Sequence, residues 1–158
     1  MKTVNIVLVG LGGQGIITAS DILADAAFRA GLDVKKAEVH GMSQRGGSVR
    51  TDVRFGSAVL SPITPAASAD VVLSMDPSQD PAAELLKRAG GGVVLTPAVI
   101  AGISLPSPKT ATVAMLGALS RHLEIPEEAW KGAIAAVFPE KILGMNLEAF
   151  ALGRTAAA

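Results

Sequence analysis

Cysteine is absent from this chain of 158 residues. That absence excludes disulfides, thiolate nucleophiles and cysteine ligands for zinc or iron–sulfur clusters. Aromatic residues make up only 3%, so the chain lacks the platforms on which proteins stack nucleic-acid bases. Neither sign of charge is in excess, because 14 Lys and Arg residues match 14 Asp and Glu residues. Because the formal net charge is zero, no long-range electrostatic field would attract nucleic acid or an anionic membrane, and the sequence predicts neither as a partner.

Long apolar runs are also missing. None approaches the roughly 18 residues that a membrane span requires. The apolar run at 4–11 follows a single lysine and breaks into glycines, unlike a secretory signal, so we expect a cytoplasmic protein. Hydrophobic residues at 49% against 18% charged residues exclude disorder. The length suits one core, and we expect a single domain over 1–158.

Short apolar runs alternate with helical patterns through the first two thirds of the chain. Strands are expected at 4–9, 33–39, 69–75 and 93–96, and helices at 14–30 and 81–89. Three further helices are expected at 111–123, 127–137 and 140–152, two of them starting near prolines. The predicted fold is α/β, a three-layer Rossmann-like domain with a mostly parallel sheet, a β-hairpin and C-terminal helices.

The expected hairpin lies between the second and third apolar runs. Residues 48–55 alternate apolar and polar side chains, and Gly56-Ser57 forms a plausible turn into residues 58–60. This pattern predicts a hairpin with one polar face. On that face, Arg50, Asp52 and Arg54 are expected to form a charge ladder at the protein surface.

A first glycine-rich segment follows the first expected strand directly. It fits the pattern G-x-G-x-x-G and opens a helix, with candidate binding residues Gly10, Gly12, Gly13, Gln14 and Gly15. Glycines allow a tight turn and close approach of an anion, while unpaired amides at a helix N-terminus supply hydrogen-bond donors. The alternative is a tight joint in an α/β sheet that holds no ligand.

This pattern also occurs in dinucleotide-dependent dehydrogenases, which add an acidic residue at the end of the second strand. Glu38 is the nearest candidate, but its spacing from the glycines is long. The chain also leaves no room for a substrate domain and shows no acid–base set. A free-standing Rossmann-type dinucleotide-binding oxidoreductase or sensor is therefore kept as the alternative function.

A second glycine-rich segment leaves the end of the second expected strand. If that strand runs parallel to the first, both segments share the sheet edge where open α/β sheets bind ligands. For each side chain taken alone, a local structural role is the favoured interpretation. Their clustering among glycines instead favours binding, because backbone amides and a guanidinium there suit a phosphate or carboxylate. The candidate binding residues are His40, Gln44, Arg45, Gly46, Gly47 and Ser48. No catalytic triad, paired carboxylates or metal-ligand cluster stands out.

Together the two segments resemble the γ-type domain of 2-oxoacid:ferredoxin oxidoreductases. The match runs through residues 7–15 and 38–49 and extends, more weakly, over nearly the whole chain. The form His40-Gly41-Met42-Ser43-Gln44 resembles the arylpyruvate branch, which acts on indolepyruvate. Neither segment alone is specific for this family, whereas the two together are.

The resemblance implies a subunit that is inactive by itself. The family decarboxylates a 2-oxoacid on thiamine diphosphate, passes electrons through iron–sulfur clusters to ferredoxin and forms an acyl-coenzyme A. It implies that thiamine diphosphate, magnesium and the clusters belong to a large partner subunit, with none held by this chain alone. The two loops would then face the partner's active site or coenzyme A. In isolation the chain is also compatible with a homodimer or a homo-oligomeric scaffold that associates through its polar hairpin.

Overall fold

The first apolar run forms β1 (Val4–Leu11), the central strand of the sheet. A computed structural model describes residues 1–40 and 47–157, and within them the sheet has five strands in the order β2-β3-β1-β4-β5. β1 is parallel to β4, β4 is parallel to β5, and β3 is antiparallel to both β1 and β2. All strands except β3 therefore share one direction, as the expected mostly parallel sheet requires. The remaining strands are β2 (Asp33–His40), β3 (Ser48–Gly56), β4 (Val71–Ser74) and β5 (Val93–Leu95).

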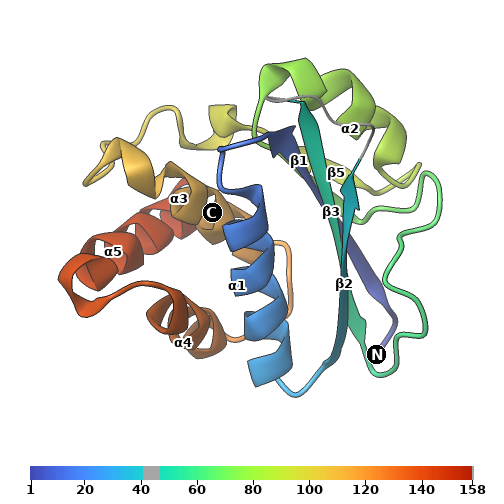
Figure 1. Cartoon of the computed structure of the whole chain (residues 1–158), viewed down its shortest axis with the longest axis horizontal. Coiled ribbons are helices and arrows are strands. Elements are labelled where there is room, and N and C mark those ends of the chain that lie inside the picture. The colour runs from blue at the N-terminus through green and yellow to red at the C-terminus, as the bar shows by residue number, and fades with distance from the viewer. Residues whose placement is uncertain (41–46, 158) are drawn as a thin grey trace.

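Helices cover both faces of this sheet, which gives three layers (Figure 1). One face carries α1 (Ile16–Arg29), α3 (Ala111–Ser120), α4 (Glu127–Val137) and α5 (Glu140–Ala156). The other face carries the short helix α2 (Asp80–Leu86). Short 3-10 helices occupy Pro77–Gln79, Pro97–Ile100 and Pro108–Thr110. Within the described ranges, no helix is long and apolar enough to cross a membrane.

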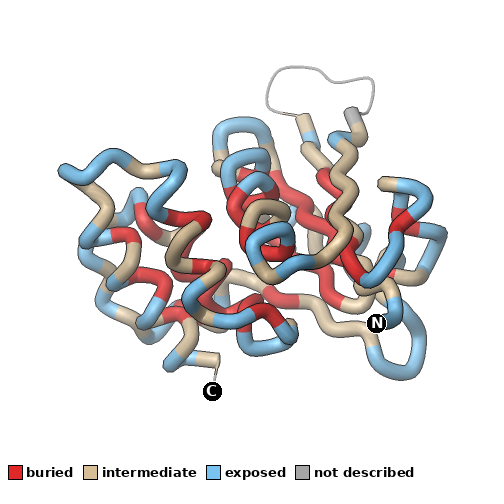
Figure 2. Tube along the Cα trace, turned by 90° about the horizontal axis from the view of Figure 1, so that it is seen from below, coloured by how far each residue is buried: buried red, intermediate tan, exposed pale blue. Residues whose placement is uncertain are grey.

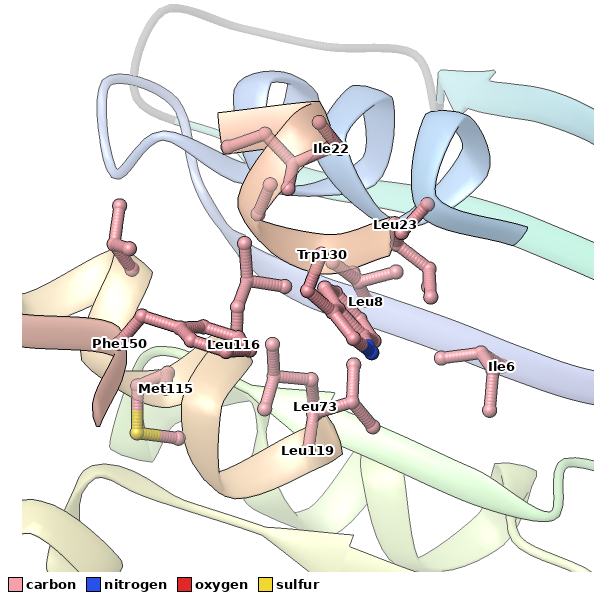
Figure 3. Close-up of a cluster of buried hydrophobic side chains, with 14 of the residues drawn as sticks. Ile6, Leu8, Ile22, Leu23, Leu73, Met115, Leu116, Leu119, Trp130 and Phe150 are labelled. Atoms are coloured by element: carbon pink, nitrogen blue, oxygen red, sulfur yellow. The ribbon is translucent and has the colours of Figure 1, made fainter. Parts of the chain in front are cut away.

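The main core lies between the sheet and the larger helical layer. Ile6 and Leu8 of β1 point into it and meet side chains from α3, α4 and α5 (Figure 3). Trp130 of α4 packs against Phe150 of α5 with ring centroids 5.7 Å apart, and both are almost completely buried. Buried residues follow the sheet and the inner helix faces, while the outer faces are exposed (Figure 2). Each large side chain buried in this way contributes about 1.5–3 kcal/mol to the hydrophobic stabilisation.

The hairpin prediction named the wrong partner strand. β3 pairs with β2, in a register that places Val39 opposite Arg50, and residues 58–60 are not a strand. The charge-ladder prediction is also wrong, because Asp52 is completely buried. β3 has a neighbouring strand on each side, and the segment after it folds back over its polar face. There the Thr64 amide donates a 2.8 Å hydrogen bond to Asp52 Oδ2.

Candidate functional site

The two glycine-rich segments meet at one edge of the sheet. Leu11, the last residue of β1, pairs with Ser48, the first residue of β3. Just beyond this pair, the Gly12 amide donates a hydrogen bond of 3.2 Å to the Gly47 carbonyl oxygen. β1 and β2 share a direction, as expected, but β3 lies between them. The first segment therefore contacts the end of the second through β3, and not through β2.

Part of the second segment lies outside the described residues. This part contains Gln44, Arg45 and Gly46, so the structure places none of these three candidates. His40 closes β2 opposite Val49, and only its backbone is described. The described parts of the two segments are residues 10–15 and the amino end of β3, with Gly47 before it.

Glycine is required at some positions of the first segment and not at others. Gly13 and Gly15 adopt left-handed conformations, with φ of 88° and 79°. A Cβ at Gly10 would lie 2.7 Å from Cδ1 of Ile16 and 2.8 Å from Oε1 of Gln14, so both side chains would have to shift to make room for it. Gly12, in contrast, has no positive φ and open space where its Cβ would be. The fold of the described residues therefore gives no reason for glycine at this position.

Gln14 is held by contacts within the chain. Its Oε1 accepts a 2.7 Å hydrogen bond from the Leu11 amide, and its Nε2 donates to Asp76 Oδ2 at 2.8 Å. Asp76 follows β4 and also accepts hydrogen bonds from the side chain and amide of Ser78. These bonds, chiefly that from the Ser78 hydroxyl, hold the pKa of Asp76 below its ordinary value of 3.8. Gln14 thus ties the glycine-rich turn to the end of β4, and both polar ends of its side chain are engaged.

Some amides of the turn remain available for a ligand. The amides of Leu11, Gly12 and Gln14 donate to acceptors within the chain. Among the described residues, nothing accepts a hydrogen bond from the amides of Gly13 and Gly15. They precede the first turn of α1, where the helix dipole favours negative charge. The geometry can therefore accommodate a small anionic group, although nothing bound to the chain tests that use.

Two hollows flank the amino end of β3. One, of about 150 Å³, lies on the α1 side against Gly12, Gly13 and Ile17. The other, of about 370 Å³, lies on the α2 side and is mostly apolar. Val49 lines both hollows. A larger hollow of about 460 Å³ surrounds the start of β1 and His122, away from both glycine-rich segments.

Arg50 is a functional candidate that the sequence did not reveal, because its position in β3 was interpreted as part of a charge ladder at the protein surface. Arg50 lines the α2-side hollow, and its Nε and Nη2 donate to the two carboxylate oxygens of Asp52 at 2.7 and 2.9 Å. The side chain of Arg50 is 29% exposed and that of Asp52 is fully buried. A buried carboxylate therefore fixes the guanidinium plane, and no described residue accepts a hydrogen bond from Nη1. The one indication in the sequence was that Arg50 closely follows two candidate binding residues, Gly47 and Ser48.

Comparison with known proteins decides the family. The chain matches the family described as pyruvate ferredoxin/flavodoxin oxidoreductase over residues 5–107 and 79–156. It belongs to that family. It is 35% identical to the indolepyruvate oxidoreductase subunit IorB of Thermococcus kodakarensis, a match that covers 99% of this chain and 97% of that one. It is 28% identical to the common γ subunit of pyruvate/ketoisovalerate oxidoreductases from the same organism, over 89% of this chain and 92% of that one.

Solved structures of this family share the fold. The 2-oxoglutarate:ferredoxin oxidoreductase of Magnetococcus marinus superposes with a TM-score of 0.79 at 26% identity over 99% of this chain. Our chain spans about a third of that longer chain, 31% of its length. The γ subunit of a keto/oxoacid ferredoxin oxidoreductase from Geobacter sulfurreducens superposes with a TM-score of 0.74 over 98% of both chains. At 23% identity, this second match supports the fold alone.

The iron–sulfur clusters of the family do not fit the residues of this chain. Thiamine diphosphate and iron–sulfur clusters serve these oxidoreductases, and the clusters are held by cysteine thiolates. This chain has no cysteine. Across residues 1–40 and 47–157, no group of three or more His, Asp or Glu side chains is placed to hold a metal ion. The chain therefore supplies no cysteine ligand for an iron–sulfur cluster.

Proposed function

We propose that this chain is the small subunit of a 2-oxoacid:ferredoxin oxidoreductase that acts on indolepyruvate or a related arylpyruvate. The observation that carries the proposal is the match to an IorB subunit over almost the whole length of both chains. Other IorB subunits support it, including that of Pyrococcus horikoshii, at 43% identity over 90% of this chain. The lack of a catalytic set among the described residues agrees with a subunit that needs a partner.

The partner is a large subunit that holds thiamine diphosphate, magnesium and iron–sulfur clusters and passes electrons to ferredoxin. The whole complex oxidatively decarboxylates the 2-oxoacid and transfers the acyl group to coenzyme A. Our chain contributes no redox centre to this reaction. Its part is to bind the large subunit and to complete the surroundings of the active centre.

The edge formed by residues 10–15 and 47–50 is the face that we assign to this task. Open space at Gly12, the amides of Gly13 and Gly15 and the guanidinium of Arg50 all lie along it. These donors suit phosphate or carboxylate groups, such as those of coenzyme A or of a partner loop. In support, the related Magnetococcus structure has coenzyme A and succinyl-coenzyme A bound. Gln44 and Arg45, from the segment between β2 and β3, are proposed to join this face.

Reconstitution tests the proposal. The purified chain should not reduce a viologen dye with indolepyruvate and coenzyme A, and activity should appear when the large subunit is added. In the reconstituted complex, Arg45→Ala should lower kcat/KM by about 10-fold if one charge-assisted contact is lost. Lys141→Ala, in the exposed first turn of α5, is the matched control and should retain full activity.

Two outcomes would contradict the proposal. Robust activity of the chain without any partner would exclude the role of an inactive subunit. Tight binding of NAD, NADP or FAD by the chain alone would favour the Rossmann-type dinucleotide-binding alternative. Calorimetric titration with these three ligands and with coenzyme A distinguishes the two functions.

A further inference from the structure

The hollow of about 460 Å³ lies at the end of the sheet where its parallel strands begin. Val4, Val71 and Val93 line it, and these are the first residues of β1, β4 and β5. The glycine-rich turn leaves the other end of β1, so the hollow and the candidate site lie at opposite ends of the sheet (Figure 1). Pockets for small molecules have volumes of about 300–1,000 Å³. The hollow is therefore large enough for a small molecule and separate from the glycine-rich edge.

Arg88 is held at this hollow by the chain around it. Its Nε donates a 3.0 Å hydrogen bond to Asp70 Oδ1, and the Asn5 amide donates to Asp70 Oδ2 at 2.8 Å. The Arg88 amide donates to the Ala69 carbonyl oxygen at 2.7 Å. The guanidinium lies so close to Gly91 that a Cβ there would be 3.0 Å from Nη1 and 3.3 Å from Nη2. The structure thus orients the guanidinium through Nε, and no described residue accepts a hydrogen bond from Nη1 or Nη2.

Two further charged side chains line the hollow. Lys2 precedes β1, and Glu124 lies in the connection between α3 and α4. Within residues 1–40 and 47–157, neither side chain forms a hydrogen bond or an ion pair. Arg88 follows α2, which packs on the face of the sheet opposite to α3 and α4. The hollow is therefore lined by a guanidinium from the connection after one helical layer and by a carboxylate from the other layer.

The charges at the hollow decide which ligand fits. Lys2 and Arg88 are matched in number by Asp70 and Glu124, and both oxygens of Asp70 already accept hydrogen bonds. A purely anionic ligand would meet the carboxylate of Glu124, and a purely cationic ligand would meet Arg88 and Lys2. A zwitterion satisfies both kinds of group, because its carboxylate suits the guanidinium and its ammonium suits Glu124. The pattern therefore favours a ligand with one carboxylate and one ammonium group.

The rest of the lining is apolar. Val4, Val71, Val93 and Leu123 contribute hydrocarbon surface, of which Val71 is the most deeply buried. Small-molecule sites have this composition, with apolar walls and a few polar groups that fix the orientation of the ligand. An apolar side chain on the zwitterion would leave water by packing against these residues.

From these observations we propose that the hollow binds a free α-amino acid with an apolar side chain. The carboxylate of the ligand contacts Nη1 and Nη2 of Arg88, with Lys2 beside it, and the ammonium group contacts Glu124. The side chain of the ligand packs against the valines at the strand ends. The proposal is independent of the enzymatic role, because none of these residues belongs to the edge formed by residues 10–15 and 47–50.

Calorimetric titration of the full chain tests the class of ligand. L-Phenylalanine should bind with a Kd of about 1 mM or tighter. 3-Phenylpropionate, which lacks the ammonium group, and 2-phenylethylamine, which lacks the carboxylate, should each bind about tenfold more weakly or worse. Equal affinity for L-phenylalanine and 3-phenylpropionate would overturn the proposal. So would the absence of binding by both L-phenylalanine and L-leucine.

Matched variants test the position of the site. Arg88→Ala and Glu124→Gln should each weaken the binding of L-phenylalanine about tenfold. Lys109→Ala and Glu148→Gln are the controls, because both side chains are exposed and lie outside the hollow, and they should leave the Kd unchanged. Gly91→Ala displaces the guanidinium but keeps its charge and its ion pair partner, so it should weaken binding even if Arg88→Ala fails to fold. An unchanged Kd in Glu124→Gln, or equal losses in the variants and their controls, would overturn the proposal.

Discussion

At the scale of single residues, glycine has a packing role at position 10, whereas at position 12 we attribute it to the proposed binding site. The first has Ile16 packed against it, whereas the second faces open space and has an ordinary backbone conformation. A glycine that the fold does not require is better explained by something that approaches it from outside.

Alanine substitution at both glycines checks this distinction. Gly10→Ala should lower the free energy of unfolding by about 1–3 kcal/mol, because its methyl group overlaps Cδ1 of Ile16. Gly12→Ala should change the free energy by less than about 0.5 kcal/mol. In the reconstituted complex, however, Gly12→Ala should reduce activity severalfold. Urea denaturation and dye-reduction assays measure the two effects, and full activity of Gly12→Ala would remove this position from the site.

The buried carboxylate of Asp52 is the second residue with a clear expected effect. Asp52→Asn leaves Arg50 without its bidentate partner and should cost about 1–3 kcal/mol in the free energy of unfolding. The matched control is Asp25→Asn, since Asp25 forms an exposed pair with Arg29 on α1. That change should cost less than about 0.5 kcal/mol. Equal losses in the two variants would show that burial of Asp52 does not matter.

At the scale of elements, periodicity predicted where most strands and helices lie. The helix over 127–137 was predicted with the bounds of α4, and the run at 4–9 became β1. The predicted hairpin partner of β3 was wrong for two reasons. Residues 58–60 are apolar enough to suggest a strand, and strand pairing depends on contacts between residues distant in the sequence. α5 continues to Ala156, past the predicted end at 152, since nothing in its last turn stops a helix.

The packing of α3 against α5 is an element property that periodicity did not reveal. A Cβ at Gly153 would lie 1.8 Å from the Ala114 carbonyl oxygen, and one at Gly117 would lie 2.1 Å from that of Phe150. The two helices therefore touch through their backbones at both glycines.

Alanine at position 153 should separate these helices. Gly153→Ala should destabilise the protein by about 3 kcal/mol or more, because the overlap is with rigid backbone. Gly144→Ala, in the same helix but facing open space, should instead stabilise it by about 0.5–1 kcal/mol. Thermal denaturation followed by circular dichroism distinguishes the two. A stable Gly153→Ala variant would mean that α3 and α5 can move apart freely.

At the scale of the whole molecule, the alternation of apolar runs with helical patterns predicted the fold class, whereas the single domain over 1–158 stays a prediction. Apolar residues and short connections were sufficient to predict an α/β domain. The glycine-rich patterns predicted that the two segments meet at one edge of the sheet, and the Gly12 amide does donate to the Gly47 carbonyl oxygen. Burial of Asp52 was not predictable, because it depends on a segment that crosses β3 only after the chain has folded.

The two core clusters share one sheet, which predicts a single unfolding transition. Trp130, the only tryptophan, is completely buried among residues from the sheet and from four helices. Its fluorescence should therefore shift at the same urea concentration at which far-UV circular dichroism loses helix signal. Separate midpoints for the two signals would show that the helical layer unfolds independently of the sheet.

The pairing of Leu11 with Ser48 has a consequence for how relatives can diverge. β2 ends at His40 and β3 begins at Ser48 in the same sheet, and Gly47 is bonded to the glycine-rich turn. Exchange of the amino acids at positions 41–46 would leave both anchors in place. Under the proposed function, substitutions at these six positions would change the contacts to a ligand or partner and leave the strands that carry them intact.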